Sequence, residues 1–158
     1  MNIKELFNYD PETGILRWIG SRSNRVKYLD IAGTIGKSGY LMVGILDKRY
    51  QVHRVIWFYM YGKWPDGDID HINGIKTDNR IENLRDVTRS VNKQNIKRAN
   101  LNNKYKLLGV FWHKASKKYL AKIMLNGNSK HLGLFDCPQA AHEAYLQAKR
   151  ELHEGNTL

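Results

Sequence analysis

A polar stretch in the middle of the chain carries the residues whose types and spacing are suited to chemistry. Residues 68–95 read DIDHINGIKTDNRIENLRDVTRSVNKQN and are dense in oxygen ligands. Neighbouring side chains on an extended strand point to opposite faces, so Asp70 and His71 can serve two partners. The carboxylate suits a cation, and a neutral imidazole accepts a proton from water near neutral pH. The pair therefore predicts a site for a cation and an activated water, provided that the strand ends at an open site.

Local signals around this pair predict the elements that position it. Asn73 and Gly74 give the strand a tight exit, and a second strand follows the loop. Thr88 is suited to cap a helix that begins at Arg89, which places Asn92 in its first turns. The segment is thus predicted as a strand, a loop, a second strand and a helix.

The first fifty residues read as β-hairpins. Short apolar runs at 15–19, 40–46 and 50–52 are separated by turn residues at 10–14, 36–39 and 47–48. Residues 53–61 are almost continuously apolar and aromatic and are followed by Gly62, a pattern typical of a buried helix with a glycine cap.

The last third of the chain predicts a three-stranded sheet and a closing helix. Runs at 109–113, 118–125 and 130–135 read as strands, and Asn126-Gly127 is a strong hairpin turn. Pro138 begins an amphipathic helix that ends near Gly155. We therefore expect an α+β fold with four segments: a β region at 1–49, a catalytic segment at 50–97, a basic linker at 98–107 and a sheet-plus-helix module at 108–158.

The motif formed by Asp70-His71, Asn83 and Asn92 resembles the HNH endonucleases, in the variant of phage homing and nicking enzymes in which asparagine replaces the last histidine. The resemblance covers about residues 50–97. It implies a strand-strand-helix unit that grips one divalent ion and hydrolyses DNA phosphodiesters. By position, it implies that Asp70 and Asn92 ligate the metal, that His71 is the general base, and that Asn83 braces the loop and holds the histidine.

One carboxylate and one amide oxygen form a hard, sparse ligand set, which favours Mg²⁺, with Mn²⁺ as the alternative. Two assignments stay open at this point. Asn95 lies three residues beyond Asn92 and could share its helix face, and Asn79 is a rival for the role of Asn83. His53 is interpreted as a core residue or a hydrogen-bonding neighbour of the site rather than as a metal ligand.

The charge distribution favours a polyanionic partner. Lys and Arg number 26 against 15 Asp and Glu, a net charge of +11. No acidic residue occurs from Val87 to Phe135, whereas eleven basic residues do. We expect double-stranded DNA as the partner, with phosphate contacts from Arg89, Lys93, Lys97 and Arg98.

Residues 108–154 resemble the Apetala-two domain of plant ethylene-response factors and of many phage endonucleases. The resemblance rests on the runs LGVFW, YLAKI, HLGLF and AAHEAY, and it implies that the sheet lies in the major groove of DNA. Alternation places Phe111, His113, Lys122 and His131 on the outer face of this sheet. Lys117 and Lys118, at the turn, are expected to contact phosphates.

Other features limit the possible classes of protein. The chain has no run of eighteen apolar residues and no secretory signal pattern near its first residues. We therefore expect a cytoplasmic, phage-encoded protein that acts in the host cell, rather than an exported or membrane protein. A single cysteine, Cys137, excludes an intrachain disulfide. We expect no small-molecule cofactor and favour a monomer. The rival interpretations are a non-catalytic DNA-binding regulator and, more distantly, an RNA-binding protein.

Overall fold

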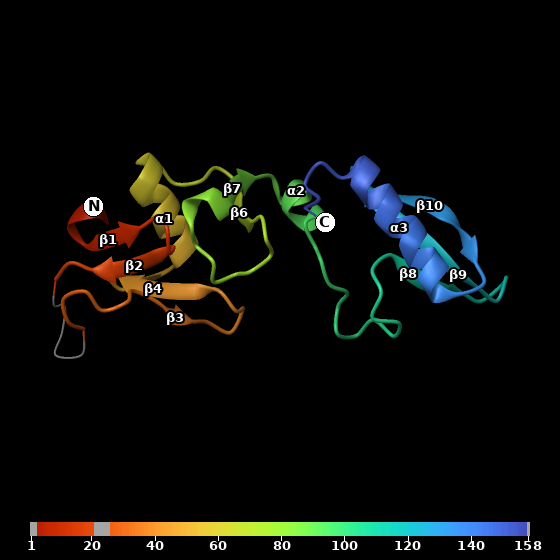
Figure 1. Cartoon of the computed structure of the whole chain (residues 1–158), viewed down its shortest axis with the longest axis horizontal. Helices are drawn as coiled ribbons and strands as arrows, with labels where there is room; N and C mark the ends of the chain where they lie inside the picture. Colours follow the sequence, from red (N-terminus) through yellow and green to blue (C-terminus); the bar gives the residue numbers. More distant parts are fainter. Residues whose placement is uncertain (1–2, 21–25, 158) are drawn as a thin grey trace. The chain divides into compact units, whose positions relative to one another are not determined.

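The computed structural model describes residues 3–20 and 26–157 (Figure 1). Within these ranges the chain has the predicted α+β architecture, with small antiparallel sheets and three α-helices. It forms two compact units, Met1–Thr88 and Arg89–Leu158. The four functional segments expected from the sequence stay a prediction. No helix in the described ranges is both long and apolar enough to cross a membrane.

The first unit contains three small sheets and one α-helix in its described residues. A hairpin of two strands comes first, a three-stranded sheet follows, and a second hairpin closes the unit. The strands and helices are η1 (Ile3–Glu5), β1 (Phe7–Asp10), β2 (Ile15–Trp18), β3 (Thr34–Ile35), β4 (Leu41–Ile45), β5 (Lys48–Gln51), α1 (Val52–Tyr61), β6 (Asp68–His71), η2 (Ile81–Asn83) and β7 (Leu84–Val87).

One hydrophobic core joins these elements. Residues from the first hairpin, such as Phe7 and Leu16, pack in the same cluster as Ile56 of α1 and Ile69 of β6. The helix buries Val52, Val55 and Ile56, spaced by three and four residues, so a single stripe of α1 faces the core. Gly62 ends the helix with a φ of 71° and donates its N–H to the carbonyl of Phe58, as the sequence predicts. The second hairpin is therefore fixed to a core built largely by the first fifty residues.

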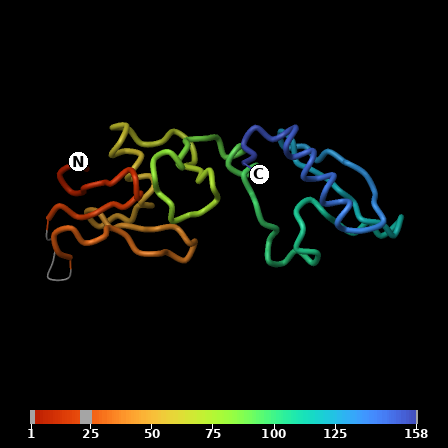
Figure 2. The backbone as a smooth tube through the Cα atoms, viewed as in Figure 1, coloured from red at the N-terminus to blue at the C-terminus, as the bar shows by residue number. Residues whose placement is uncertain are grey.

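The second unit contains α2 (Arg89–Gln94), β8 (Val110–His113), β9 (Lys118–Leu125), β10 (Asn128–Phe135) and α3 (Pro138–Leu152). The sheet has the order β10-β9-β8, and α3 packs on one of its faces, where Val110, Ala121 and Ala141 are buried. Residues 95–109 form neither helix nor strand, and the backbone trace of Figure 2 shows this long irregular stretch between α2 and β8.

Two local features fix the ends of this sheet-plus-helix module. Cys137 caps α3, because its Sγ accepts the N–H of Ala140 at 3.4 Å. Gly109 precedes β8 with a φ of 73°, and a Cβ at this position would lie 2.0 Å from the ring of Tyr145. A side chain at residue 109 would therefore collide with α3.

Candidate active site

The hairpin of β6 and β7 carries the predicted catalytic pair. Antiparallel register places Asp70 opposite Arg85 and His71 opposite Leu84. Ile69 points into the hydrophobic core, so alternation turns Asp70 to the other side of the strand. His71 is the last residue of β6, and its carbonyl accepts the N–H of Gly74 at 2.8 Å, which closes the tight exit expected at Asn73 and Gly74.

Asp70 is buried, and its carboxylate is paired with Arg85. Its Oδ2 accepts hydrogen bonds from Nε of Arg85 at 2.9 Å and from Nη2 at 2.7 Å. A carboxylate with 6% exposure needs such a partner, because an unpaired buried charge is costly. This pairing was not anticipated from the sequence. The signal for it is the hairpin register, which sets the two residues directly opposite each other.

His71 is also buried, with 4% of its surface exposed. Its Nε2 lies 3.0 Å from Oδ1 of Asn79. An amide oxygen only accepts hydrogen bonds, so Nε2 carries the proton and Nδ1 keeps the lone pair. Burial lowers the pKa of His71, while the hydrogen bond to Asn79 acts in the opposite direction. The imidazole is thus oriented and held in the neutral form that can accept a proton.

Two aromatic neighbours enclose the ring of His71. His53 of α1 meets it edge-on with the ring centres 5.0 Å apart, and Tyr40 lies 5.8 Å away. Tyr40 also packs edge-on against His53 at 5.0 Å. Burial, His71 and Arg54 lower the pKa of His53 to about 3. His53 therefore stays neutral and does not place a positive charge beside the predicted base.

Asn83 organises the loop that follows β6. Its Oδ1 accepts the N–H of Asn73 at 2.9 Å, and its Nδ2 donates to Oδ1 of Asn73 at 3.1 Å and to the carbonyl of Asp78 at 2.8 Å. The resemblance assigns Asn83 both to brace the loop and to hold the histidine. In the structure these two tasks belong to different residues, because the side chain that hydrogen-bonds His71 is that of Asn79.

An ion pair fixes the same loop from its other side. Arg80 Nη2 lies 2.7 Å from Oδ2 of Asp78, and Asn73 also donates to this carboxylate at 2.7 Å. The hydrogen bonds from Arg80 are the main reason that the pKa of Asp78 is lowered to about 2. The loop therefore keeps its charged brace throughout the neutral pH range.

The first hairpin, β1 and β2, holds the backbone of Asn79 in place. The hydroxyl of Tyr9 on β1 donates to the carbonyl of Asn79 at 2.9 Å, and burial raises the pKa of Tyr9 to about 12, so the hydroxyl keeps its proton. Gly14 has a φ of 71°, and a Cβ there would lie 2.4 Å from the backbone nitrogen of Arg80. The turn of the first hairpin thus packs directly on the loop that orients His71.

Asn92 lies on α2 in the second unit. Its rival Asn95, just beyond the helix, is 6% exposed, and its Oδ1 accepts a hydrogen bond from the hydroxyl of Thr157. Gln94 next to it accepts the N–H of Gly155 at 3.0 Å through Oε1. The side-chain oxygen of Asn95 thus helps to hold the residues around Thr157 against α2, and the choice of Asn92 over Asn95 as a metal ligand stays a prediction.

The donor set fits a hard divalent cation. The described residues 3–20 and 26–157 contain no group of three or more His, Cys, Asp or Glu placed to hold a metal. The predicted set of one carboxylate, Asp70, and one amide, Asn92, needs no such group, since water and phosphate oxygens complete the coordination of Mg²⁺. That the two side chains share a metal stays a prediction.

The outer face of the second unit's sheet gathers part of the predicted DNA-binding set. Lys122 Nζ lies 4.3 Å from the ring centre of Phe111, which is 43% exposed. His131 is the register partner of Lys122 and is exposed. His113 lies near the turn, where its Nδ1 is 2.8 Å from Oγ of Ser116. Phe111, Lys122 and His131 therefore form one surface with aromatic and cationic character.

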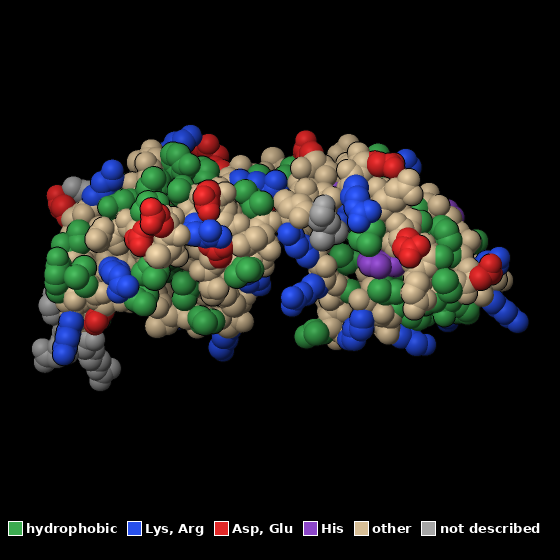
Figure 3. All heavy atoms as spheres, in the orientation of Figure 1, with side chains coloured by type: hydrophobic (Ala, Val, Ile, Leu, Met, Phe, Trp, Pro, Cys, Tyr) green, Lys and Arg blue, Asp and Glu red, His purple; other side chains and the backbone are tan. Residues whose placement is uncertain are grey.

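The remaining predicted DNA contacts differ in their surroundings. Lys118 pairs with Asp136 at 3.0 Å, and Lys117 is exposed in the turn with a φ of 53°. Arg89 and Lys93 are exposed on α2, and Arg98 is exposed just beyond it. Lys97 is half-buried and donates to the carbonyl of Thr157 at 3.2 Å. Lys and Arg side chains lie over both units on the face drawn in Figure 3.

Comparison with known proteins gives a family match for one part of the chain. Residues 50–101 match the sequence model of a family described as HNH endonuclease. The matched segment contains Asp70, His71, Asn83 and Asn92. The motif predicted a segment of this kind over about residues 50–97, and the family model matches at that place.

One solved structure can be aligned with most of the chain. It is described as "DNA binding and cleavage by the HNH homing endonuclease I-HmuI", and it shares 23% sequence identity with a TM-score of 0.45. The match covers 98% of this chain and 93% of the other. No curated protein matches significantly. The Apetala-two resemblance of residues 108–154 stays a prediction, although the sheet and helix that it implies are present.

Proposed function

We propose that this protein is a metal-dependent DNA endonuclease of the HNH type. The observation that carries the proposal is that the segment matching the HNH endonuclease family holds an oriented, neutral His71 next to the buried carboxylate of Asp70. A general base must be neutral and must present a lone pair to the water that it activates. The hydrogen bond of Nε2 to Asn79 leaves Nδ1 as that atom.

The proposed reaction is hydrolysis of a phosphodiester. His71 Nδ1 takes a proton from water while the water oxygen forms a bond to phosphorus. The bond between phosphorus and the 3′ oxygen breaks, and the departing oxygen takes a proton from solvent, which leaves a 5′ phosphate and a 3′ hydroxyl. Asn79 keeps the imidazole in one orientation, and Asn83 and Arg80 keep the loop in place around it. A positioned base contributes about 100- to 10,000-fold to such a rate.

Asp70 and Asn92 are the residues that would hold the metal, with Mg²⁺ preferred and Mn²⁺ as the alternative. When bound, a divalent ion supplies stabilisation of the negative charge that develops at the phosphate and the departing oxygen. Arg85 fixes the carboxylate of Asp70 through two hydrogen bonds, so the ligand does not need to be ordered when the substrate binds.

Placement on DNA is assigned to the basic residues predicted above. Arg89, Lys93, Lys97 and Arg98 would neutralise phosphates, as would Lys117 and Lys118 at the turn of the second unit. Phe111, His113, Lys122 and His131 would meet the duplex through the outer face of the sheet. That face offers no arginine, so phosphate and shape contacts are expected to outweigh direct base reading.

The test compares plasmid cleavage by the parent chain with that by His71→Ala, with and without Mg²⁺. The substitution should lower cleavage by about 100-fold or more, with duplex affinity within about twofold of the parent, because the imidazole takes a proton but holds no phosphate. Thr77→Ala is the matched control, since Thr77 is exposed in the same loop. Equal cutting by His71→Ala and the parent would refute the assignment of the base. Strand-specific end-labelling of the products then separates a nick from a double-strand break.

The choice between Asn92 and Asn95 is tested in the same assay. Asn92→Ala should abolish cleavage or raise the Mg²⁺ concentration that it needs, and Asn92→Asp should retain cleavage because it keeps an oxygen ligand. Asn95→Ala should cut at the rate of the parent once the fraction of folded protein is taken into account.

A second candidate function is a DNA-binding regulator that does not cut. The observation in its favour is that Asp70 is paired with Arg85 and His71 is 4% exposed, as in a purely structural hairpin. A regulator would retard the plasmid in a gel and leave it covalently closed at every Mg²⁺ and Mn²⁺ concentration. Competition between duplex DNA and RNA for the parent chain separates both candidates from an RNA-binding protein.

A further inference from the structure

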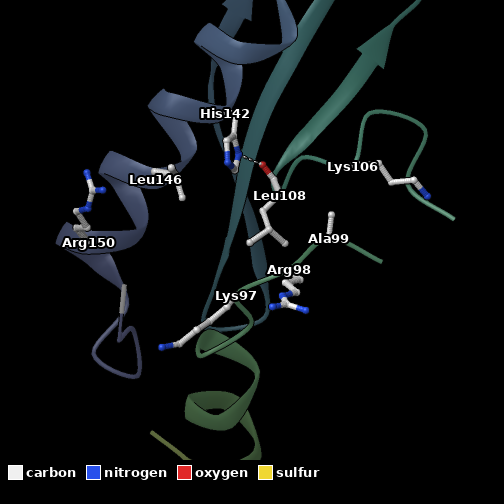
Figure 4. A pocket seen from close by; sticks show the side chains of 8 residues that line it. All are labelled: Lys97, Arg98, Ala99, Lys106, Leu108, His142, Leu146 and Arg150. Atoms are coloured by element: carbon white, nitrogen blue, oxygen red, sulfur yellow. Dashed lines mark hydrogen bonds between the residues drawn. The ribbon is translucent and has the colours of Figure 1, made fainter. Parts of the chain in front are cut away.

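A pocket in the second unit lies between the irregular stretch after α2 and the helix α3. It has a volume of about 450 Å³. Lys97, Arg98 and Lys106 contribute to it from the irregular stretch, and Arg150 contributes from the helix (Figure 4). No carboxylate is found among its lining residues. The pocket therefore collects four positive charges without an acidic counterpart in its walls.

These cations are not neutralised by ion pairs elsewhere in the described residues. The ion pairs found within 3–20 and 26–157 involve other Lys and Arg side chains. Lys97 and Lys106 donate to the backbone carbonyls of Thr157 and Leu101, which satisfies N–H groups but does not cancel the charge. Arg98 and Arg150 are both exposed. An anion in the pocket would relieve the mutual repulsion of all four.

Buried Lys149 adds to the positive potential at the same place. It follows the pocket residue Leu146 by three positions on α3 and is 1% exposed, and an N–H of its ammonium group donates a hydrogen bond to the carbonyl of Ile96. Burial is the main cause that lowers the pKa of Lys149, and the charge of Lys97 acts in the same direction. The structure thus holds a fifth cationic side chain close enough to Lys97 to repel it.

Apolar side chains line the pocket beside the cationic ones: Leu108, Leu146 and Ala99. Leu108 and Leu146 face each other across it in the close-up, and His142 lies beside them with its Nδ1 2.9 Å from the carbonyl of Leu108 (Figure 4). The carbonyl accepts, so this nitrogen donates. Leucines next to cationic side chains match a ligand that carries both an apolar ring face and a negative charge. The volume is within the range of pockets that hold small molecules, about 300–1,000 Å³.

We propose that this pocket binds the sugar-phosphate backbone of one DNA strand, with a phosphate on the cationic side chains and its deoxyribose against Leu108 and Leu146. The inference rests on the proposed function in taking DNA as the ligand. It adds a second surface to the one predicted on the sheet, because α3 packs on the sheet face opposite Phe111 and Lys122. Lys106, His142 and Arg150 then belong to the DNA-binding residues of the chain.

The test uses the full chain with Lys106→Gln and Arg150→Gln combined. Its matched control combines Lys48→Gln and Lys63→Gln, which removes the same two charges from exposed positions of the first unit. Affinity for a fluorescent 30-base-pair duplex is measured by anisotropy between about 50 and 300 mM NaCl. Each lost phosphate contact lowers the slope of log Kd against log salt by about 0.9. Because the proposal places one phosphate in the pocket, we expect the slope of the pocket variant to fall by about 0.9 and that of the control to match the parent.

A second measurement reports on the pocket itself and does not depend on a change in the net charge of the chain. The ring protons of His142 are followed by NMR in the parent chain while the duplex or inorganic phosphate is added. The duplex should shift these resonances at stoichiometric concentration, and inorganic phosphate should shift them only at millimolar concentration. A shift with phosphate and none with the duplex would show an anion site that DNA does not use, and would overturn the proposal.

The failure of this inference is distinct from the failure of the proposed function. If the parent cuts DNA while the pocket variant keeps its salt slope and His142 does not respond to the duplex, the pocket proposal is wrong and the endonuclease stands. If the parent never cuts DNA but the salt slope of the pocket variant is lower than that of the parent, the pocket proposal stands and the proposed endonuclease function is wrong. A parent that does not bind duplex DNA at all contradicts both.

Discussion

Acid should destabilise the first unit through His53. This residue is 3% exposed on α1, and burial, His71 and Arg54 lower its pKa from 6.5 to about 3. In the unfolded chain the imidazole ionises near its ordinary pKa, so below about pH 6.5 the unfolded state binds a proton that the folded state does not. The stabilisation is thus fully present above pH 6.5 and is lost as the pH falls towards 3.

The size of the effect follows from the linkage relation. The free energy of unfolding falls by about 1.4 kcal/mol per pH unit between the two pKa values, which is about 2 kcal/mol between pH 7.5 and pH 5. The groups that face His53 are His71, Arg54 and the uncharged ring of Tyr40. Because burial also lowers the pKa of His71, that histidine adds a smaller loss in the same direction.

Urea unfolding at pH 7.5, 6 and 5 measures this loss in the parent and in His53→Gln. Both chains carry Trp112→Phe, so the fluorescence comes from the three tryptophans of the first unit. Glutamine keeps a polar side chain but does not titrate. The loss of unfolding free energy between pH 7.5 and 5 should be smaller in His53→Gln by about 2 kcal/mol.

The slope with pH, and not the absolute stability, decides the outcome, so a variant that is less stable at every pH remains informative. His131→Gln is the control, since His131 is exposed on β10, and it should lose as much stability as the parent. If His53→Gln and the parent lose the same free energy down to pH 5, His53 is not held neutral and the reasoning from burial is refuted.

Three further substitutions test the supports of the site. Asn79→Ala removes the acceptor of the His71 Nε2–H and should lower the free energy of unfolding by about 1–2 kcal/mol and plasmid cleavage by about 10- to 100-fold, with duplex affinity unchanged in anisotropy. Arg85→Ala leaves the Asp70 carboxylate buried without its partner and should cost about 3 kcal/mol in urea unfolding, of which Arg85→Lys recovers part. Asn83→Ala deletes three hydrogen bonds and should lower the free energy of unfolding by about 2 kcal/mol. Amide hydrogen exchange checks this, because exchange should become faster only in the loop after β6.

Elements with strong local signals could be predicted from the sequence. The helix before Gly62, the strands around Asn126-Gly127 and the helix that begins at Pro138 are present close to their expected bounds. Each depends on a residue whose backbone preference acts within a few positions: a left-handed glycine, a tight turn, or a proline in a first helical turn. The strand-loop-strand-helix order around Asp70 was predicted for the same reason.

Features set by distant parts of the chain were not predicted. Strands β1 and β3 are only four and two residues long, and β2 and β4 provide their hydrogen-bonding partners. The pair of Asp70 and Arg85 depends on the register of a hairpin whose loop spans twelve residues, 72–83. The hydrogen bond from His71 reaches Asn79 and not Asn83, which depends on how that loop folds. Residue types alone do not distinguish two asparagines in one loop.

The first hairpin shows why a catalytic motif is insufficient to specify its own geometry. Its residues have no chemistry of their own, yet Tyr9 bonds the carbonyl of Asn79, and Gly14 packs where any side chain would meet the backbone of Arg80. Asn79 in turn sets which nitrogen of His71 carries the proton. A substitution at Gly14 would therefore displace the loop and change the orientation of an imidazole with which it has no contact. The motif supplies the reactive groups, and the β-rich region before it supplies their orientation.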